Sequence, residues 1–332
     1  MQAIIREYLE KAKVGRKQVY KNMAVFPLLS DYSLTSDYIL LDEALTSGVI
    51  EVTELDNHGA VPNLKVHNKS PRMVLILDGE ELVGAKQNRI VNTTILIAGD
   101  ATVIIPVSCV EQGRWSYKSP QFYSEKRMMP SQMRAMKAAQ ILCSVKARGE
   151  YQADQSAIWE EISQRANRRD AMSPSMAMAG IYEKDLPSLQ EYLEHFSLIG
   201  SQVGAVFLIN GKVVGMDGFG KPETFSKTFK KLVESYALDA VDWLEEGKEH
   251  KASRSEVTKF IQGTLACSLE THAGVGLGTD CRLESGKLNG FALSFDDKVV
   301  HMSIFASPED NKRRSQTSRM ARFSRRNQNR VY

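Results

Sequence analysis

Residues 73–97 read MVLILDGEELVGAKQNRIVNTTILI and decide the fold. Two apolar runs rich in β-branched residues, MVLI and IVNTTILI, stand at either end of this stretch. Such runs favour strands, and the nearly continuous apolar character of residues 90–97 indicates a strand buried on both faces. The Asp78-Gly79 pair between the runs is typical of a tight turn, so the stretch predicts a β-hairpin.

Similar strand signals continue on both sides of this stretch. Strands separated by Gly, Asp and Asn breaks are predicted at residues 49–55, 64–68, 73–79, 89–97 and 101–111. The region lacks the regular alternation of strand and helix that a parallel sheet requires. It therefore predicts an antiparallel meander rather than strand-helix-strand units.

From about Pro130 the apolar period changes to that of helices. Helices are predicted at residues 1–14, 36–48, 131–149, 154–169, 185–196, 221–247 and 255–269. For the short helix at 36–48, Ser36 or Asp37 is the expected N-cap, with Gly48 just past its end. Asp185 is the expected cap of a helix that carries proline in its first turn.

Residues 205–218, AVFLINGKVVGMDG, predict a second hairpin around Asn210-Gly211. Its pattern resembles that of residues 74–84, and the two hairpins are either an old duplication or two ordinary hairpins. Further strands are predicted at residues 274–283, 288–295 and 299–306. The expected fold class is α+β: one compact body of mainly antiparallel sheet, with helices concentrated between residues 130 and 270.

Composition excludes several classes of protein. The 332 residues are 42% hydrophobic and 25% charged, which is typical of a globular chain rather than a disordered one. No run approaches the roughly 18 apolar residues of a membrane helix, and the N-terminus lacks the apolar core of a signal peptide. The four cysteines form no CxxC pair, which argues against a disulfide framework and favours the cytosol.

The basic residues are concentrated at the C-terminal end. Residues 311–332 hold eight Lys and Arg and no Asp or Glu, so the rest of the chain carries 35 basic against 40 acidic residues, a net charge of −5. We expect a globular domain over residues 1–310 and a poorly ordered basic tail over 311–332. Weak binding of polyanions is the function that such a tail predicts.

The first candidate site lies in the opening stretch, where a tight turn explains only two residues. Asp78, Glu80, Glu81, Lys86, Asn88 and Arg89 surround that turn and abut a buried-looking run. A solvated loop is one interpretation of these charges. If they are buried instead, they need partners, and they then form either a structural ion network or a polar ligand site.

A second cluster follows the strand at 101–111, within PVSCVEQGRW. Arg114 is suited to hold a phosphate while Trp115 stacks on a base, with Glu111 beside them. The alternative is a strand-end salt bridge with a core tryptophan. Cys109 has no histidine nearby in the sequence, so a core cysteine is favoured over a nucleophile.

The remaining motifs are weaker. Asp217, between glycines in GMDGFG, is a candidate ligand or base, or else begins a turn or caps a helix. His301 is better explained as a core histidine than as a catalyst. No phosphate-binding loop and no metal-ligand spacing occur in the sequence, so no metal is predicted and the cofactor is unknown.

These motifs together resemble the ARPP-type domain, the ARG and rhodanese-phosphatase-superfamily-associated protein family. The resemblance runs from FPLL near residue 26 to VHMSIF near 305 and includes LILDGEELVGAKQNR, PVSCVEQGRW, DQSAIW and GKVVGMDGF. It implies a role beside ADP-ribosylglycohydrolases and phosphatase-like proteins, in the processing of NAD-derived or ADP-ribose nucleotides.

The leading hypothesis is a cytosolic enzyme, a hydrolase of a nucleotide or ADP-ribose-like compound. Its expected acid and base residues are Glu80, Glu81, Glu111 and Asp217, and its expected ligand-binding residues are Asp78, Lys86, Asn88, Arg89, Arg114 and Trp115. The alternatives are a non-catalytic domain that binds a ligand or partners ADP-ribose-processing enzymes, and a nucleic-acid binder that uses the basic tail.

Deletion of residues 311–332 tests the prediction for the tail. We expect the melting temperature to stay nearly unchanged, because the tail has few apolar anchors. If the full chain binds a polyanion, its affinity should fall by orders of magnitude between roughly 50 and 200 mM salt. A large drop in melting temperature on deletion would instead show that the tail packs against the globular part.

Overall fold

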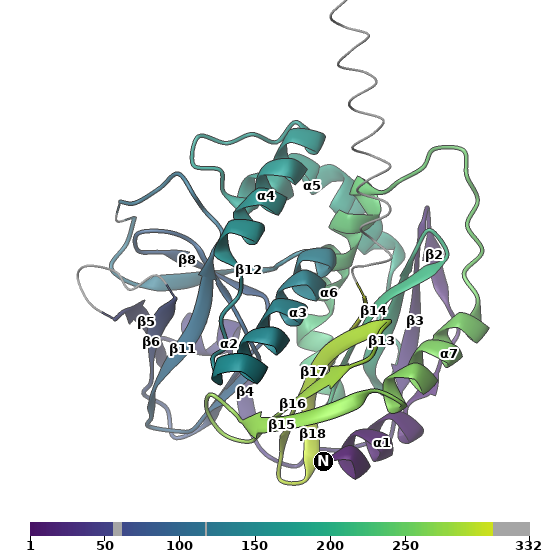
Figure 1. Ribbon diagram of the computed structural model, residues 1–332, viewed down its shortest axis with the longest axis horizontal. Helices are drawn as coiled ribbons and strands as arrows, with labels where there is room; N and C mark the ends of the chain where they lie inside the picture. Colours follow the sequence, from purple (N-terminus) through teal and green to yellow (C-terminus); the bar gives the residue numbers. More distant parts are fainter. Residues whose placement is uncertain (56–61, 117, 308–332) are drawn as a thin grey trace, which may run out of the picture.

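The larger part of the computed structural model is an antiparallel sheet of nine strands (Figure 1), formed within the described residues 1–55, 62–116 and 118–307. Its order is β1-β3-β13-β14-β18-β17-β16-β15, and β2 also pairs with β3. The strands are β1 (Lys13–Val14), β2 (Gln18–Tyr20), β3 (Met23–Leu29), β13 (Gln202–Ile209), β14 (Lys212–Phe219), β15 (Ser268–Ala273), β16 (Thr279–Glu284), β17 (Leu288–Phe295) and β18 (Lys298–Ala306).

Two smaller sheets lie on the other side of the molecule. One has the order β12-β8-β9-β11-β6-β5 and is antiparallel, and the other has the order β10-β7-β4, in which β4 and β7 run parallel. Their apolar side chains share one core, which includes Val52, Ile76 and Ile105. The strands are β4 (Tyr38–Leu40), β5 (Ile50–Glu54), β6 (Asn63–Asn68), β7 (Met73–Ile76), β8 (Glu80–Gly84), β9 (Arg89–Val91), β10 (Ile95–Ile97), β11 (Thr102–Cys109) and β12 (Phe122–Met128).

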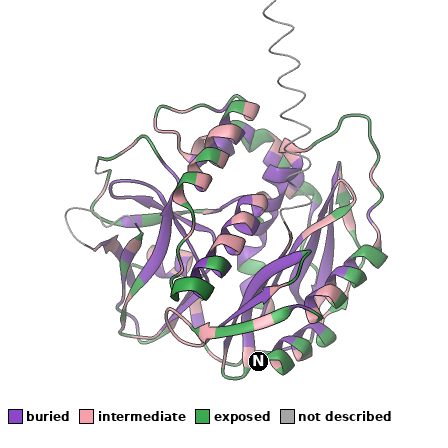
Figure 2. Cartoon of the chain, in the orientation of Figure 1, coloured by how far each residue is buried: buried purple, intermediate pink, exposed green. Residues whose placement is uncertain are grey.

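Helices cover both faces of the large sheet. The described residues form α1 (Gln2–Lys11), α2 (Leu41–Thr46), α3 (Ser131–Arg148), α4 (Gln155–Arg169), α5 (Met178–His195), α6 (Pro222–Asp242) and α7 (Arg254–Leu265). Helices α3 and α6 pack between the large sheet and the smaller ones, whereas α1 and α7 cover the opposite face (Figure 1). Most strands of the large sheet are therefore buried, whereas its edge strand β15 is largely exposed (Figure 2).

Local sequence explains where several elements begin and end. Helix α4 begins after Asp154, whose side chain accepts a hydrogen bond from Ala157 N at 3.1 Å. Helix α3 ends at Gly149, which takes the left-handed conformation with φ of 71°. Pro222 occupies the first turn of α6, where its missing N–H costs nothing.

The predicted fold class is confirmed, because the sheets are mostly antiparallel and belong to one body. The predicted hairpin at Asn210-Gly211 is also present, with Ile209 paired to Lys212. The predicted hairpin at Asp78-Gly79 is wrong. A tight turn does form there, with Glu80 N donating to Leu77 O at 3.3 Å, but β7 pairs with β10 and β4 while β8 pairs with β12 and β9.

That turn passes the chain from one sheet to another instead of folding it back on itself. The likeness between residues 74–84 and 205–218 is therefore a likeness of sequence between two different structures. The run at 89–97 also divides, because β9 joins the six-stranded sheet and β10 joins the three-stranded one.

Two predicted helix starts are wrong. Tyr38–Leu40 form the parallel strand β4, and α2 begins only at Leu41, where Glu43 Oε2 accepts from Leu40 N at 2.9 Å. Helix α5 starts at Met178, so Asp185 lies within it and pairs with Arg169 at 2.5 Å instead of acting as a cap. In both cases a tertiary partner outweighs the local capping signal.

The described residues bear on two further expectations. The predicted tail over 311–332 lies outside them, so the division of the chain at residue 310 stays a prediction. In the part of the chain that the structure describes, no helix has both the length and the apolar composition needed to span a bilayer.

Gly79 offers a test of the turn between β7 and β8. Its φ is 82°, and a Cβ added there would lie 3.1 Å from Arg134 Cδ. Gly48 is the matched control, because its φ is 70° but an added Cβ would meet nothing within 4 Å. We expect Gly48→Ala to cost about 1–2 kcal/mol of unfolding free energy, and Gly79→Ala about 1–3 kcal/mol more. Equal losses of unfolding free energy in the two variants, measured by urea denaturation, would show that the Arg134 side chain moves aside without cost.

Candidate functional site

Most of the residues that the sequence singled out are buried. The buried ones are Asp78, Glu80, Glu81, Lys86, Asn88, Arg89, Glu111 and Asp217. The Arg114 side chain keeps 15% of its surface exposed, and Trp115 is 52% exposed. The solvated-loop interpretation is therefore wrong, and so is the interpretation of Trp115 as a core tryptophan. The buried charges divide into two networks, and whether they surround one pocket stays a prediction.

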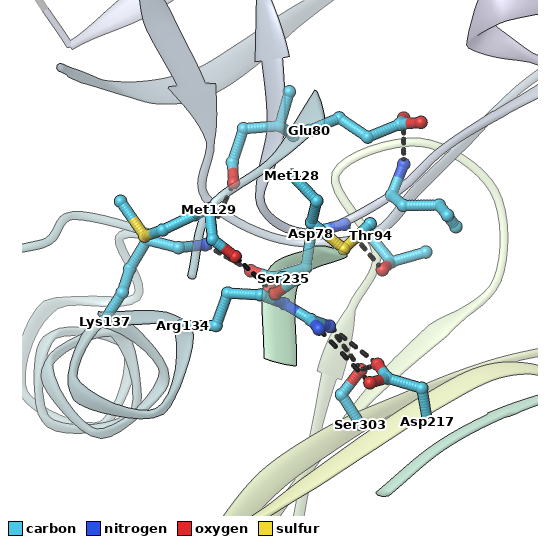
Figure 3. A network of polar contacts seen from close by, with 12 residues as sticks. Asp78, Glu80, Thr94, Met128, Met129, Arg134, Lys137, Asp217, Ser235 and Ser303 are labelled. Carbon is cyan, nitrogen blue, oxygen red and sulfur yellow. Dashed lines mark hydrogen bonds and ion pairs between the residues drawn. The ribbon is translucent and has the colours of Figure 1, made fainter. Parts of the chain in front are cut away.

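The first network is centred on Arg134 of α3 (Figure 3). Its Nη2 lies 2.7 Å from Asp217 Oδ1 and its Nη1 lies 3.2 Å from Oδ2, a two-pronged contact. Its Nε lies 3.4 Å from Oδ2 of Asp78, in the turn between β7 and β8. One guanidinium thus joins the large sheet to the corner between the two smaller sheets.

Asp217 is saturated with donors. Besides Arg134, Ser303 Oγ donates to its Oδ1 at 2.5 Å and the Tyr236 hydroxyl donates to its Oδ2 at 2.8 Å. Burial by itself would raise the pKa of Asp217, but the charge and hydrogen bonds of Arg134 outweigh burial and hold this pKa well below its usual range. Asp217 lies within strand β14, so neither the turn nor the helix-cap alternative applies.

His301 belongs to the same network. Its Nδ1 lies 2.7 Å from Thr94 Oγ1, and its Nε2 lies 3.2 Å from Ser303 Oγ. Burial lowers the pKa of His301, although the neighbouring Asp217 carboxylate opposes this. These contacts support the interpretation of His301 as a neutral core histidine.

Lys137 holds the other oxygen of Asp78. It pairs with Asp78 Oδ1 and donates to Val91 O at 2.9 Å and to Asn92 O at 3.1 Å. Burial lowers the pKa of Lys137 to about 8, against the opposing attraction of Asp78. All three ammonium protons thus have acceptors, so the contacts indicate a structural role.

Glu80 has a structural setting of the same kind. It pairs with Lys231 of α6, which also contacts Asp42 of α2 at 2.8 Å. The second carboxylate oxygen of Glu80 accepts a hydrogen bond from Leu77 N at 2.8 Å. Burial raises the pKa of Glu80, although Lys231 opposes the shift. The trio ties β8 to two helices.

The second network surrounds Asn88 and connects four of the predicted residues. Asn88 Nδ2 donates to Glu81 Oε1 at 3.3 Å, and Asn88 N donates to Glu111 Oε2 at 3.2 Å. Arg114 Nη2 donates to Asn88 Oδ1 at 3.0 Å and lies 2.7 Å from Glu111 Oε2. Arg114 Nη1 also donates to Ala85 O at 2.6 Å, which fixes the segment after β8.

The two carboxylates of this network differ in partners and in pKa. Glu81 is fully buried, and among the described residues its Oε2 has no hydrogen-bond partner. Burial raises the pKa of Glu81 to about 7, and the opposing charge of Arg127, 4.0 Å away, does not overcome it. For Glu111 burial acts to raise the pKa, but the hydrogen bonds from Arg114, Ser175 and the Asn88 backbone together outweigh burial and lower it. One acid is therefore poised near neutrality and the other is held ionised.

Arg89 lies on the far side of this network. Its Nη1 donates to Gln87 Oε1 at 3.0 Å and contacts Cys109 Sγ at 2.9 Å, and Gln87 Nε2 donates to Glu111 O at 2.8 Å. Its Nη2 lies 3.5 Å from Glu54 Oε1. Burial raises the pKa of the Cys109 thiol, which supports its interpretation as a core cysteine.

The rim of the second network is formed by Lys86 and Trp115. The Lys86 Nζ lies 5.4 Å from the centroid of the Trp115 ring, within the range of a cation–π contact. Because Trp115 is half exposed, it is the part of this network that solvent reaches most easily.

Sequence reasoning missed the basic partners Arg134, Lys137, Lys231 and Arg127. A signal for the first two was present. Arg134 and Lys137 lie one turn apart in the helix predicted at 131–149, on the side that also holds Ala138 and Ile141. A charged residue in an apolar stripe requires a buried partner, but helical spacing does not say which one. Among the residues that the structure describes, no group of three or more His, Cys, Asp or Glu is arranged to hold a metal.

The fold and the two networks define an α+β domain whose buried charges join its sheets. Residues 11–305 match the model of the ARG and Rhodanese-Phosphatase-superfamily-associated Protein domain, so the chain belongs to that family. No curated protein and no solved structure matches the chain.

Arg134→Met tests the first network. It leaves the carboxylates of Asp217 and Asp78 buried without their shared guanidinium, so we expect a loss of about 3–5 kcal/mol of unfolding free energy. Arg148→Met is the matched control, because Arg148 lies on the same helix with 60% of its side chain exposed. Addition of Asp217→Asn to Arg134→Met should restore part of the loss. A loss from Arg134→Met as small as the control's would contradict the assignment.

Proposed function

We propose that this protein is a hydrolase of a nucleotide or ADP-ribose-like compound and that Glu81 transfers the proton. The observation that carries the proposal is the state of the Glu81 carboxyl. Its Oε2 is buried without a hydrogen-bond partner among the described residues and lies 4.0 Å from Arg127. Asp217, Glu80 and Glu111 instead each accept a hydrogen bond from a cation. An orphaned buried oxygen costs free energy that a purely structural acid would avoid.

The pKa of Glu81 suits general acid–base work. Burial raises this pKa to about 7, where a group both holds and releases a proton at neutral pH. Glu111 stays ionised beside Arg114 and, through the Asn88 backbone and side chain, keeps the Glu81 carboxyl oriented. Glu81 would give its proton to the leaving group, and a water molecule would supply the hydroxyl that completes the hydrolysis.

The rim supplies features that suit a nucleotide. Trp115 offers an exposed aromatic face for a base, with the Lys86 ammonium beside it. The Arg114 side chain is 15% exposed, but its guanidinium already donates to acceptors within the protein, so in this proposal Arg114 orients the network. Asp78, Glu80 and Asp217, in this proposal, hold the frame and take no part in proton transfer.

The family supports the class of substrate. The name of the family associates the domain with ARG and with the rhodanese-phosphatase superfamily, and we take ARG to stand for ADP-ribosylglycohydrolase. A partner of such enzymes would meet ADP-ribose and related nucleotides. The four cysteines are free thiols, which is consistent with the cytosolic location that we include in the proposal.

Glu81→Gln tests the catalytic role. The purified variant and the wild-type protein are incubated with NAD, ADP-ribose and related nucleotides, and the products are identified by mass spectrometry. We expect wild-type turnover to fall about 10²- to 10⁴-fold, because Gln keeps the shape but cannot donate a titratable proton. Unchanged turnover in the variant would contradict the proposal. Ligand binding without turnover in the wild type would favour the non-catalytic alternative.

The pH dependence of stability in the same variant distinguishes a catalytic Glu81 from a structural one. The pKa of Glu81 rises from 4.5 to about 7 on folding. The contribution of Glu81 to the stability of the folded state is therefore complete below pH 4.5, and it is lost as the pH rises through 7. Glu81→Gln should therefore gain stability over the wild type between pH 5 and 8, by up to about 3 kcal/mol. Glu80→Gln, which breaks a buried pair with Lys231, should lose stability. A loss in both variants would mark Glu81 as structural.

A further inference from the structure

Strand β12 is irregular at the point where it passes Glu81. Ser124 pairs with Leu82 and Met128 pairs with Glu80, so residues 125–127 stand opposite Glu81 alone. The backbone of Lys126 takes a positive φ of 56° to allow this. Such a bulge breaks the regular ladder and re-aims the side chains that it carries, and bulges are enriched next to active sites.

The bulge aims Arg127 at the orphaned oxygen of Glu81. Arg127 Nη1 lies 4.0 Å from Glu81 Oε2, beyond hydrogen-bond distance, and its guanidinium lies 5.7 Å from the centroid of the Tyr182 ring. The Arg127 side chain is 21% exposed, while that of Glu81 is fully buried. Arg127 therefore links this buried oxygen to the partly exposed surface of the bulge.

Arg127 differs from the other arginines near the predicted site residues. Arg134 and Arg114 each donate several hydrogen bonds to protein acceptors, and Arg89 contacts Gln87 and Cys109. Among the described residues, no hydrogen bond from the Arg127 guanidinium is formed. A planar cation with free donors, partly exposed beside a carboxyl oxygen that accepts no hydrogen bond, is arranged to receive an anion with two or three acceptor oxygens.

We propose that Arg127, presented by the β12 bulge, binds a phosphate of the ligand on which Glu81 acts. This inference rests on the proposed function of Glu81 and names the group of the ligand that the protein recognises there. The ligand class is a phosphate-bearing nucleotide, and a diphosphate such as that of ADP-ribose offers the guanidinium two adjacent acceptors.

Phosphate binding at Arg127 has a consequence for the proton on Glu81. The Arg127 charge is the main influence that opposes the raised pKa of Glu81, with the Asn88 hydrogen bond second, while Glu125 and Glu111 add to the rise. From α6, Glu234 also faces Arg127, and burial raises its pKa. A bound phosphate would neutralise Arg127, so Glu81 would keep its proton more firmly when an anionic ligand is present.

The test compares Arg127→Gln with Lys126→Gln, which removes the same charge from the adjacent, exposed position of the bulge. Affinities for ADP-ribose and for inorganic pyrophosphate are measured by calorimetry. We expect Arg127→Gln to weaken both by roughly tenfold or more, because a charge-assisted hydrogen bond is lost, and Lys126→Gln to change them less than about threefold. Arg127→Lys should fall between the two.

The number of protons taken up on ligand binding is a second measurement, and a purely structural role of Glu81 would leave it unchanged. Calorimetry of ADP-ribose binding at pH 7.5, repeated in buffers of different ionisation enthalpy, should show proton uptake by the wild type. That uptake should disappear in Glu81→Gln, which still binds. Binding by Arg127→Gln as tight as by the wild type, or no binding of either probe by the wild type, would overturn the phosphate contact. If Arg127→Gln binds as tightly as the wild type while Glu81→Gln loses turnover, only the phosphate contact fails and the role of Glu81 stands, so the two proposals fail separately.

Discussion

The structure depends on one guanidinium that is shared between two carboxylates. Arg134 is fully buried and holds Asp217 of the large sheet and Asp78 of the corner between the smaller sheets. Removing such charges from water costs several kcal/mol per ion, so each must find its partner in a narrow range of geometry. The contact therefore fixes how α3 lies across the large sheet and where β8 begins, and β8 carries Glu80 and Glu81.

The number of donors around each acid explains how the buried carboxylates differ. Asp217 accepts from Arg134, Ser303 and Tyr236, and its pKa falls far below the usual range in spite of burial. In the described part of the chain, Glu81 has only the Asn88 amide within hydrogen-bond distance, and burial raises its pKa to about 7. Asp217, with all its donors, therefore stabilises the fold as an ionised group. Glu81, with few donors, is the acid that can exchange a proton near neutral pH.

The fold could be predicted from the sequence where the signals were local. The apolar period identified the helices at 131–149 and 154–169, and Asn210-Gly211 identified a hairpin. The same kind of signal failed at Asp78-Gly79, because a turn residue sets the local backbone and leaves the pairing of the flanking strands open. For the candidate site, the sequence found the buried acids and Arg114 but not Arg127, because a strand bulge between charged residues has no pattern of its own.

The sequence by itself determined the α+β class, most of the elements and the concentration of ionisable groups between residues 78 and 114. Tertiary structure alone decided which charges meet: Arg134 stands 56 residues from Asp78 and 83 from Asp217. It also decided that Glu81 faces the Arg127 guanidinium across a bulge. The physical reason is that periodicity and turn chemistry act over a few residues, whereas the desolvation of a charge is settled by whatever group the packed chain brings beside it.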